Sequence, residues 1–156
     1  GRFREALPVY ERRIAMGGWR EEVYEALFRS ARVMDAIGSP WAAVQDRYLR
    51  AHAFDPTRAE PLYAIAKYWH ASDTHALTYL FASRAAALPV PNTTLFVDGA
   101  VYEHKAADLV AVSAYYLGQQ LNDATITNTG KRAAEMVVRA CPDDARVRKN
   151  RSFYVD

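Results

Sequence analysis

The side chains of this 156-residue chain that could take part in catalysis or metal binding are its histidines and a few carboxylates. His70 and His75 are five positions apart, so they do not share a helix face as metal ligands at i and i+4 would. Asp98, Glu103 and Asp108 lie near one another in the sequence, and a carboxylate pair can perform general acid–base chemistry. No pattern fixes their separation, and capping or ion pairing is the favoured role. We therefore predict no catalytic residue and no metal site.

The sequence also contains no recognisable catalytic nucleophile and no phosphate-binding loop. The single cysteine, Cys141, excludes an internal disulfide framework and a cysteine-based zinc site. It precedes Pro142 at an expected helix end, where a small packed residue is the favoured interpretation. Gly17-Gly18 lacks the further glycines and the lysine of a phosphate-binding loop. We expect no cofactor.

Composition excludes further classes. Hydrophobic residues make up 51% and charged residues 24%, as in an ordinary globular domain. A net charge of +2 gives no nucleic-acid footprint, and no apolar run reaches the roughly 20 residues of a membrane span. The densest basic group, Arg146, Arg148, Lys149 and Arg151, is interpreted as a solvated terminal helix. The absence of a signal peptide and the lone cysteine predict a cytoplasmic location.

The elements that must position any functional residue repeat along the chain. A shift of 34 positions superposes apolar and small residues: Phe28 on Leu62, Ala31 on Ile65, Met34 on Tyr68 and Ala51 on Ala85. A period near 34 is typical of stacked helical hairpins. Such hairpins bury their apolar faces against their neighbours and create an extended concave surface.

Local signals divide the chain in the same way. Apolar spacing and end signals predict helices over 3–16, 19–37, 40–54, 57–71, 73–88, 105–117, 131–141 and 144–153. Gly17-Gly18 and Gly38 end the first two, Ser39 is expected to cap the third, and Thr57-x-x-Glu60 predicts a capping box. Insertions are expected near 89–104 and 122–130. We therefore predict a single all-α domain over 1–156, a superhelical array of about four helical hairpins with seven or eight helices.

The first helix of each hairpin should line the concave groove. By repeat register, the groove residues are Arg29, Tyr63, Lys67 and His70. They offer two cations, an aromatic ring and a titratable donor, on a concave surface that suits a peptide or a neighbouring domain better than a transition state. They are the predicted ligand-binding residues.

Two resemblances follow from these residues. Small residues at Ala51 and Ala85, aromatic residues at Phe28 and Tyr48, and Asp55-Pro56 at a repeat end resemble tetratricopeptide repeats. Five ordered stretches resemble the helical-repeat region C-terminal to bacterial family 2 glycosyltransferase domains. They are Gly17-Gly18-Trp19-Arg20-Glu21-Glu22-Val23-Tyr24, Arg58-Ala59-Glu60-Pro61-Leu62-Tyr63, Leu95-Phe96-Val97-Asp98 with Val101-Tyr102, Ala114-Tyr115-Tyr116-Leu117-Gly118, and Asn150-Arg151-Ser152-Phe153-Tyr154.

The second resemblance implies a role outside the chemistry. In that family, an upstream α/β domain with a metal-binding Asp-x-Asp handles the nucleotide sugar. This chain contains no Asp-x-Asp, so no catalytic residue carries over. The resemblance implies a non-catalytic interaction or scaffold module that positions the catalytic domain, an acceptor or a partner subunit. An accessory domain that binds an acceptor glycan or peptide, and a self-association module that forms homo-oligomers, remain as alternatives.

Overall fold

The computed structural model describes residues 2–93 and 95–155, and within these ranges the chain is all-α, without a strand. The all-α prediction is confirmed. The elements, in chain order, are α1 (Arg2–Met16), α2 (Arg20–Ala36), α3 (Trp41–Phe54), α4 (Glu60–Ala71), α5 (His75–Ala86), the π-helical turn η1 (Val101–Lys105), α6 (Ala106–Leu121), α7 (Ala124–Ala140) and α8 (Ala145–Ser152).

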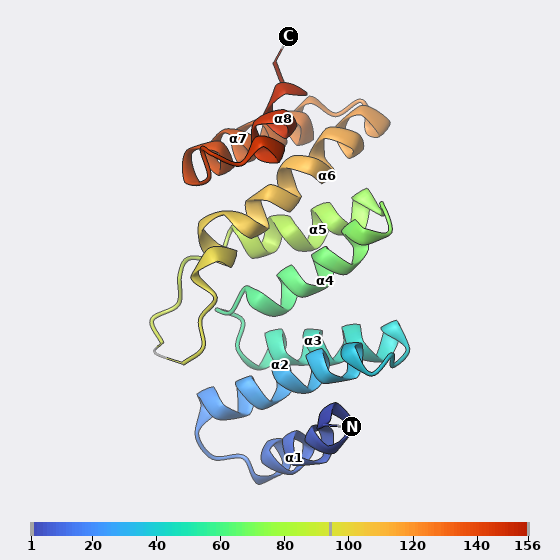
Figure 1. Cartoon of the computed structure of the whole chain (residues 1–156), viewed down its shortest axis with the longest axis vertical. Coiled ribbons are helices and arrows are strands. Elements are labelled where there is room, and N and C mark those ends of the chain that lie inside the picture. The colour runs from blue at the N-terminus through green and yellow to red at the C-terminus, as the bar shows by residue number, and fades with distance from the viewer. Residues whose placement is uncertain (1, 94, 156) are drawn as a thin grey trace.

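The helices form an elongated stack, with α1 at one end and α7 and α8 at the other (Figure 1). From α1 to α5, and again from α6 to α8, each helix packs against the next, and α5 packs directly against α6 across the connection between them. The two ends of the chain therefore lie at opposite ends of the molecule. None of the helices within 2–93 and 95–155 has both the length and the hydropathy that a bilayer crossing requires.

The core is a series of small clusters between neighbouring helices. Leu27 of α2 packs with Ala51 of α3, and Leu62 of α4 packs with Ala85 of α5. Ala51 and Ala85 are fully buried, because a methyl side chain lets two helix backbones approach closely. Each helix from α2 to α8 thus buries apolar residues against its neighbours, whereas the apolar residues of α1 are only partly covered.

Glycines end the first two helices, as their positions predict. Gly17 follows α1 with a φ of 64°, and Gly38 follows α2 with a φ of 75°, a left-handed conformation that side chains disfavour. Ser39 does not cap α3: Pro40 occupies the N-cap position, and the helix begins at Trp41. The proline ring fixes φ at −53°, which suits the last residue before a helix.

The prediction of an inserted loop at 122–130 is wrong, because α7 already begins at Ala124. Asn122 ends α6 in the left-handed conformation, and the Asp123 carboxylate accepts the backbone N–H groups of Thr125 and Ile126. A two-residue turn therefore replaces the expected insertion. Gly118 lies inside α6, so the helix continues beyond its predicted end at residue 117.

The predicted capping box is also wrong. α4 begins at Glu60, and the Thr57 hydroxyl donates to Asp55 at 2.7 Å instead of capping the helix. The carboxylate of Glu60 does not reach back to Thr57, because it is bound by Arg58.

Ahead of α6 the irregular segment covers 87–98, with residue 94 outside the described ranges, and helix resumes at Gly99. We call residues 87–98 the connecting loop.

Candidate functional site

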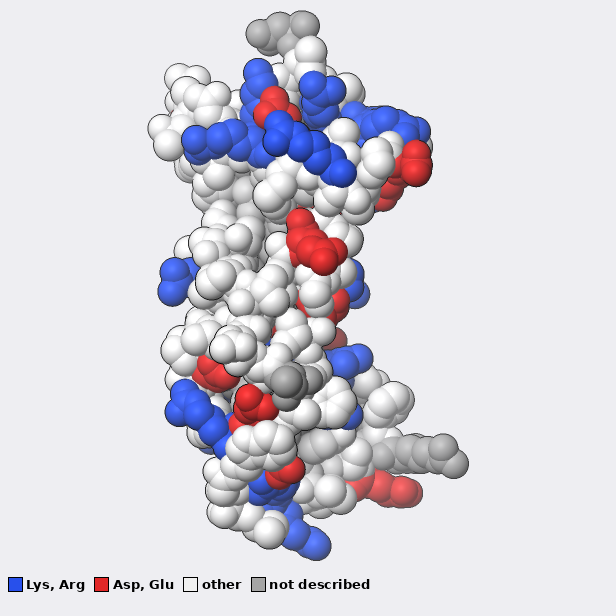
Figure 2. All heavy atoms as spheres, turned by 90° about the vertical axis from the view of Figure 1, so that its left-hand side faces the viewer, with Lys and Arg blue, Asp and Glu red and all other residues white. Residues whose placement is uncertain are grey.

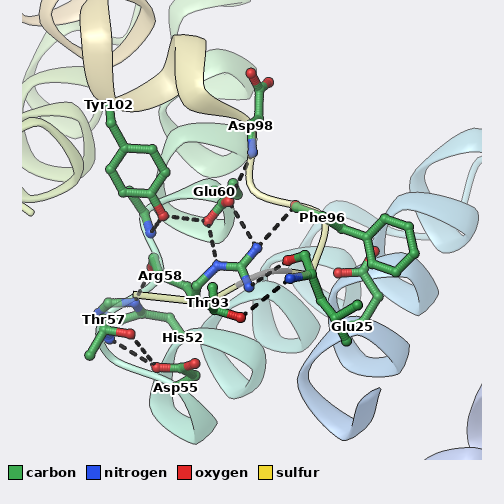
Figure 3. Close-up of polar contacts among 12 residues, drawn as sticks. Glu25, His52, Asp55, Thr57, Arg58, Glu60, Thr93, Phe96, Asp98 and Tyr102 are labelled. Carbon is green, nitrogen blue, oxygen red and sulfur yellow. Dashed lines mark hydrogen bonds and ion pairs between the residues drawn. The ribbon is translucent and has the colours of Figure 1, made fainter. Parts of the chain in front are cut away.

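The connecting loop protrudes from one side of the stack between α5 and η1 (Figure 1). Its backbone is held by two side chains, Arg58, which precedes α4, and Glu60, the first residue of α4. Arg58 donates from its guanidinium to the carbonyl oxygens of Leu95, at 3.4 Å, and Phe96, at 3.1 Å. Glu60 accepts the Asp98 backbone N–H at 3.3 Å. Figure 3 shows the Arg58 and Glu60 side chains directed toward the loop backbone.

Arg58 and Glu60 themselves form a buried ion pair. The guanidinium donates to both carboxylate oxygens, at 2.9 Å and 3.1 Å, and the two residues are 1% and 3% exposed. Tyr102 of η1 donates its hydroxyl to Glu60 at 2.8 Å and accepts the Ala59 backbone N–H at 3.0 Å (Figure 3). Buried charges require such pairing and hydrogen bonding, and the loop backbone completes the set of partners.

Tyr24 of α2 lies against this ion pair. The Arg58 guanidinium sits over its ring at 4.3 Å from the centroid, a cation–π contact. Burial raises the pKa of the Tyr24 phenol well above its ordinary value, with the Glu60 charge adding to the effect. Burial alone would lower the pKa of Arg58, but the hydrogen bond to Glu60 and nearby phenols outweigh it, and the net shift is upward. Arg58 therefore remains a cation.

The fixed loop presents apolar side chains to solvent. Phe96 is 61% exposed and Val90 is 62% exposed. Phe96 has a φ of 48°, an unusual conformation for a bulky residue that needs support from its surroundings. That support comes from Arg58, at the Phe96 carbonyl, and from Arg29, whose guanidinium lies 4.6 Å from the ring centroid.

The four predicted groove residues divide between two helices. Arg29 of α2 donates to Glu25 at 2.5 Å, a bond that raises the Arg29 pKa, and its guanidinium also lies over the Phe96 ring. Tyr63 of α4 is half-buried against the core, and burial raises its pKa. Lys67 is exposed, and His70 is half-buried with Nδ1 unpartnered among the described atoms. Tyr63, Lys67 and His70 share a face of α4, whereas Arg29 belongs to the loop contact.

Sequence reasoning missed Arg58, Glu60 and Tyr102 as the residues that fix the loop. A signal was present, because Arg58-Ala59-Glu60 and Leu95-Phe96-Val97-Asp98 are two of the stretches that carry the glycosyltransferase-region resemblance. The structure joins these two stretches through hydrogen bonds across 37 and 38 positions.

A second exposed feature is an aromatic pair between α3 and α4. The rings of Trp41 and Tyr68 stack in parallel with centroids 3.4 Å apart, and Tyr68 is 39% exposed. The Gln45 amide oxygen accepts both indole N–H groups, from Trp41 at 3.1 Å and from Trp69 at 2.9 Å. This shared acceptor fixes the two tryptophan rings at right angles to each other.

The described residues offer few features that could hold a metal ion or a small ligand. Within the described ranges no group of three or more His, Cys, Asp or Glu side chains could hold a metal ion. One shallow hollow near the C-terminal end is lined by Ala111, Val112, Tyr115, Tyr116, Asn150 and Phe153. Comparison of the chain with protein-family models, with curated proteins and with solved structures gives no match.

Proposed function

We propose that this chain is a non-catalytic interaction module, a tetratricopeptide-like superhelical array that docks onto a protein partner through the connecting loop. The observation that carries the proposal is the buried Arg58–Glu60 pair, which fixes the loop backbone and leaves Phe96 exposed. Exposed aromatic side chains on a preordered backbone are effective binding anchors, because little conformational entropy remains to be lost on association.

The choice of partner follows from the resemblance to the region C-terminal to bacterial family 2 glycosyltransferase domains. We propose that the module positions a family 2 glycosyltransferase domain, its acceptor or a partner subunit. Two of the stretches that carry this resemblance build the loop contact, which supports a shared role for them. A cytoplasmic location stays a prediction.

Site-specific photo-crosslinking tests the docking role. A benzophenone amino acid at position 96, in cells that naturally produce the chain, should yield one dominant crosslinked protein that carries a family 2 glycosyltransferase domain. The same amino acid at Leu80, which is 59% exposed on α5, is the matched control. Arg58→Met should abolish the position-96 product, because the loop loses its backbone anchor. Equal crosslinking from both positions, or a product without that domain, would contradict the proposal.

A second candidate function is binding of an acceptor glycan, favoured by the exposed and rigid Trp41–Tyr68 pair. Tryptophan fluorescence during titration with oligosaccharides would detect it, because Trp41 and Trp69 lie at that surface. Tyr68→Ser should then remove the response, while Tyr116→Ser, at another exposed tyrosine, should not. Light scattering at two concentrations tests the self-association alternative.

A further inference from the structure

The C-terminal end of the stack carries an uneven share of the positive charge. Residues 124–155 contain seven of the 20 Lys and Arg residues but three of the 18 Asp and Glu residues. Figure 2 shows basic side chains gathered over the end formed by α7 and α8, whereas the two signs mix along the rest of that face. The nearly neutral total therefore hides a local basic surface.

Five of these cations define that surface, and all are exposed: Lys131, Arg132, Arg139, Lys149 and Arg151. Within residues 2–93 and 95–155, no carboxylate lies at ion-pair distance from any of them. Arg132 and Arg139 are seven positions apart on α7, so they project from one helix face. We call these five residues the C-terminal basic surface.

From this surface we infer a binding site for an acidic, extended polypeptide segment of a partner protein. The inference rests on the proposed function, because it gives the interaction module a second contact. Three of the five residues, Arg132, Arg139 and Arg151, are arginines, and arginine forks match carboxylates in a way that lysines do not. Arg146 of α8 already pairs with a carboxylate: its Nη1 donates to both oxygens of Asp108, at 2.8 Å and 3.1 Å.

A lipid surface fits these residues less well. A helix that lies in a membrane interface needs a free apolar face beside its cations. The apolar face of α7 is buried, because Gly130, Ala134 and Val137 pack inside the stack, and α8 buries Val147. Met136 is the one large apolar side chain of α7 that is exposed.

A nucleic-acid backbone also fits less well than a polypeptide. Double-stranded DNA carries one negative charge about every 1.7 Å along its axis. Some of these closely spaced phosphates would lie opposite the acidic side chains that interrupt the basic surface, and the like charges would repel. Glu135 lies between Arg132 and Arg139 on α7, and Asp143 and Asp144 lie between α7 and α8. An extended polypeptide spaces its residues at about 3.3 Å and can place neutral residues opposite these acids.

Fluorescence anisotropy with a labelled dodecapeptide of alternating Glu and Ser tests the inference on the full chain. We expect saturable binding at about 50 mM salt that is lost at about 500 mM, because exposed charges are screened within a few ångströms there. Arg132→Glu with Arg139→Glu should weaken binding at least roughly tenfold, since each change removes an attraction and adds a repulsion. Arg4→Glu with Arg12→Glu, at two exposed arginines of α1, gives the same change in net charge and should alter binding less than about twofold.

Each other outcome is decisive. Absent peptide binding at low salt, equal weakening in the two double variants, or tighter binding of single-stranded DNA or of phosphatidylserine vesicles would overturn the inference. Crosslinking from position 96 separates this result from the docking role. If the α7 double variant still crosslinks through position 96 while no variant binds the peptide, the proposed function stands and this inference fails. If the peptide binds but position 96 crosslinks nothing, the reverse holds.

Discussion

The Tyr154 phenol lies directly over Gly130: a Cβ on Gly130 would come within 2.1 Å of the Tyr154 hydroxyl oxygen. The same Cβ would lie 2.7 Å from the Ala114 Cβ of α6. Tyr154 also donates its hydroxyl to the Ala111 carbonyl oxygen, so the residues after α8 are fixed against α6 and α7. The glycine is required by this close approach and not by its backbone conformation.

Gly130→Ala should therefore destabilise the fold by about 1–3 kcal/mol through overpacking. Urea unfolding followed by circular dichroism measures the change. Gly99→Ala is the control, because its nearest neighbour is the flexible end of Glu103 at 4.0 Å, and it should change stability by less than about 0.5 kcal/mol. Equal effects of the two substitutions would refute the packing argument.

Arg58→Met should cost about 3–5 kcal/mol, because it leaves the Glu60 carboxylate buried and unpaired. The double variant Arg58→Met/Glu60→Leu should cost clearly less than the sum of its single changes, since no buried charge remains. A double-mutant cycle in urea measures this coupling. Lys105→Met, which breaks the exposed pair with Asp98, should cost about 0–1 kcal/mol. Additive single effects would show that the two charges do not depend on each other.

Alkaline pH should weaken the fold through Tyr48. Burial, with a contribution from the Asp35 charge, raises the pKa of Tyr48 to about 12 from its ordinary value of 10.0. The unfolded chain thus loses the Tyr48 proton first as the pH rises, so the stabilisation is complete below pH 10 and declines above it. The slope from this residue approaches about 1.4 kcal/mol per pH unit between the two values. Urea midpoints at several pH values should fall less steeply in Tyr48→Phe, and an unchanged slope would contradict the assignment.

Asp123→Ala should destabilise the protein by about 1 kcal/mol, because α7 loses a side-chain cap for two backbone N–H groups. Thr57→Ala removes the residue that the sequence pattern named as a cap, and should cost less, since the Thr57 hydroxyl bonds Asp55 and not the helix. Thermal unfolding of the two variants compares them. A larger loss for Thr57→Ala would restore the capping-box interpretation.

Helix identity was predictable where the apolar period is strong and a glycine ends it. α2 and α3 agree with the predicted ranges to within a residue or so, because Gly38 and Asp55 mark their ends. The start of α7 was not predictable from local composition, which is rich in Thr and Asn. Tertiary packing overrides that composition: Gly130, Ala134 and Val137 form a buried stripe that neighbouring helices cover.

The contact between Arg58, Glu60 and the connecting loop could not be predicted from local sequence patterns, for a different reason. Thr57 and Glu60 have the spacing of a capping box, but Arg58, between them in sequence, takes the Glu60 carboxylate. Such competition depends on where Leu95 and Phe96 lie in space, and sequence spacing does not encode that. The groove residues came from repeat register, which places Tyr63, Lys67 and His70 on one helix but does not reveal that Arg29 lies over the Phe96 ring.

Gly118 gives the junction between α6 and α7 a distinctive property. A Cβ at Gly118 would lie 3.1 Å from the Thr127 backbone nitrogen and 3.3 Å from the Asp123 carbonyl oxygen, so the two backbones nearly touch. The close packing is confined to this contact, because the exposed residues Gln119, Asn122 and Asn128 line an open hollow beside it. The amides next to the Gly118–Thr127 contact should exchange with deuterium more slowly than those of α1, which lies at the opposite end and can fray.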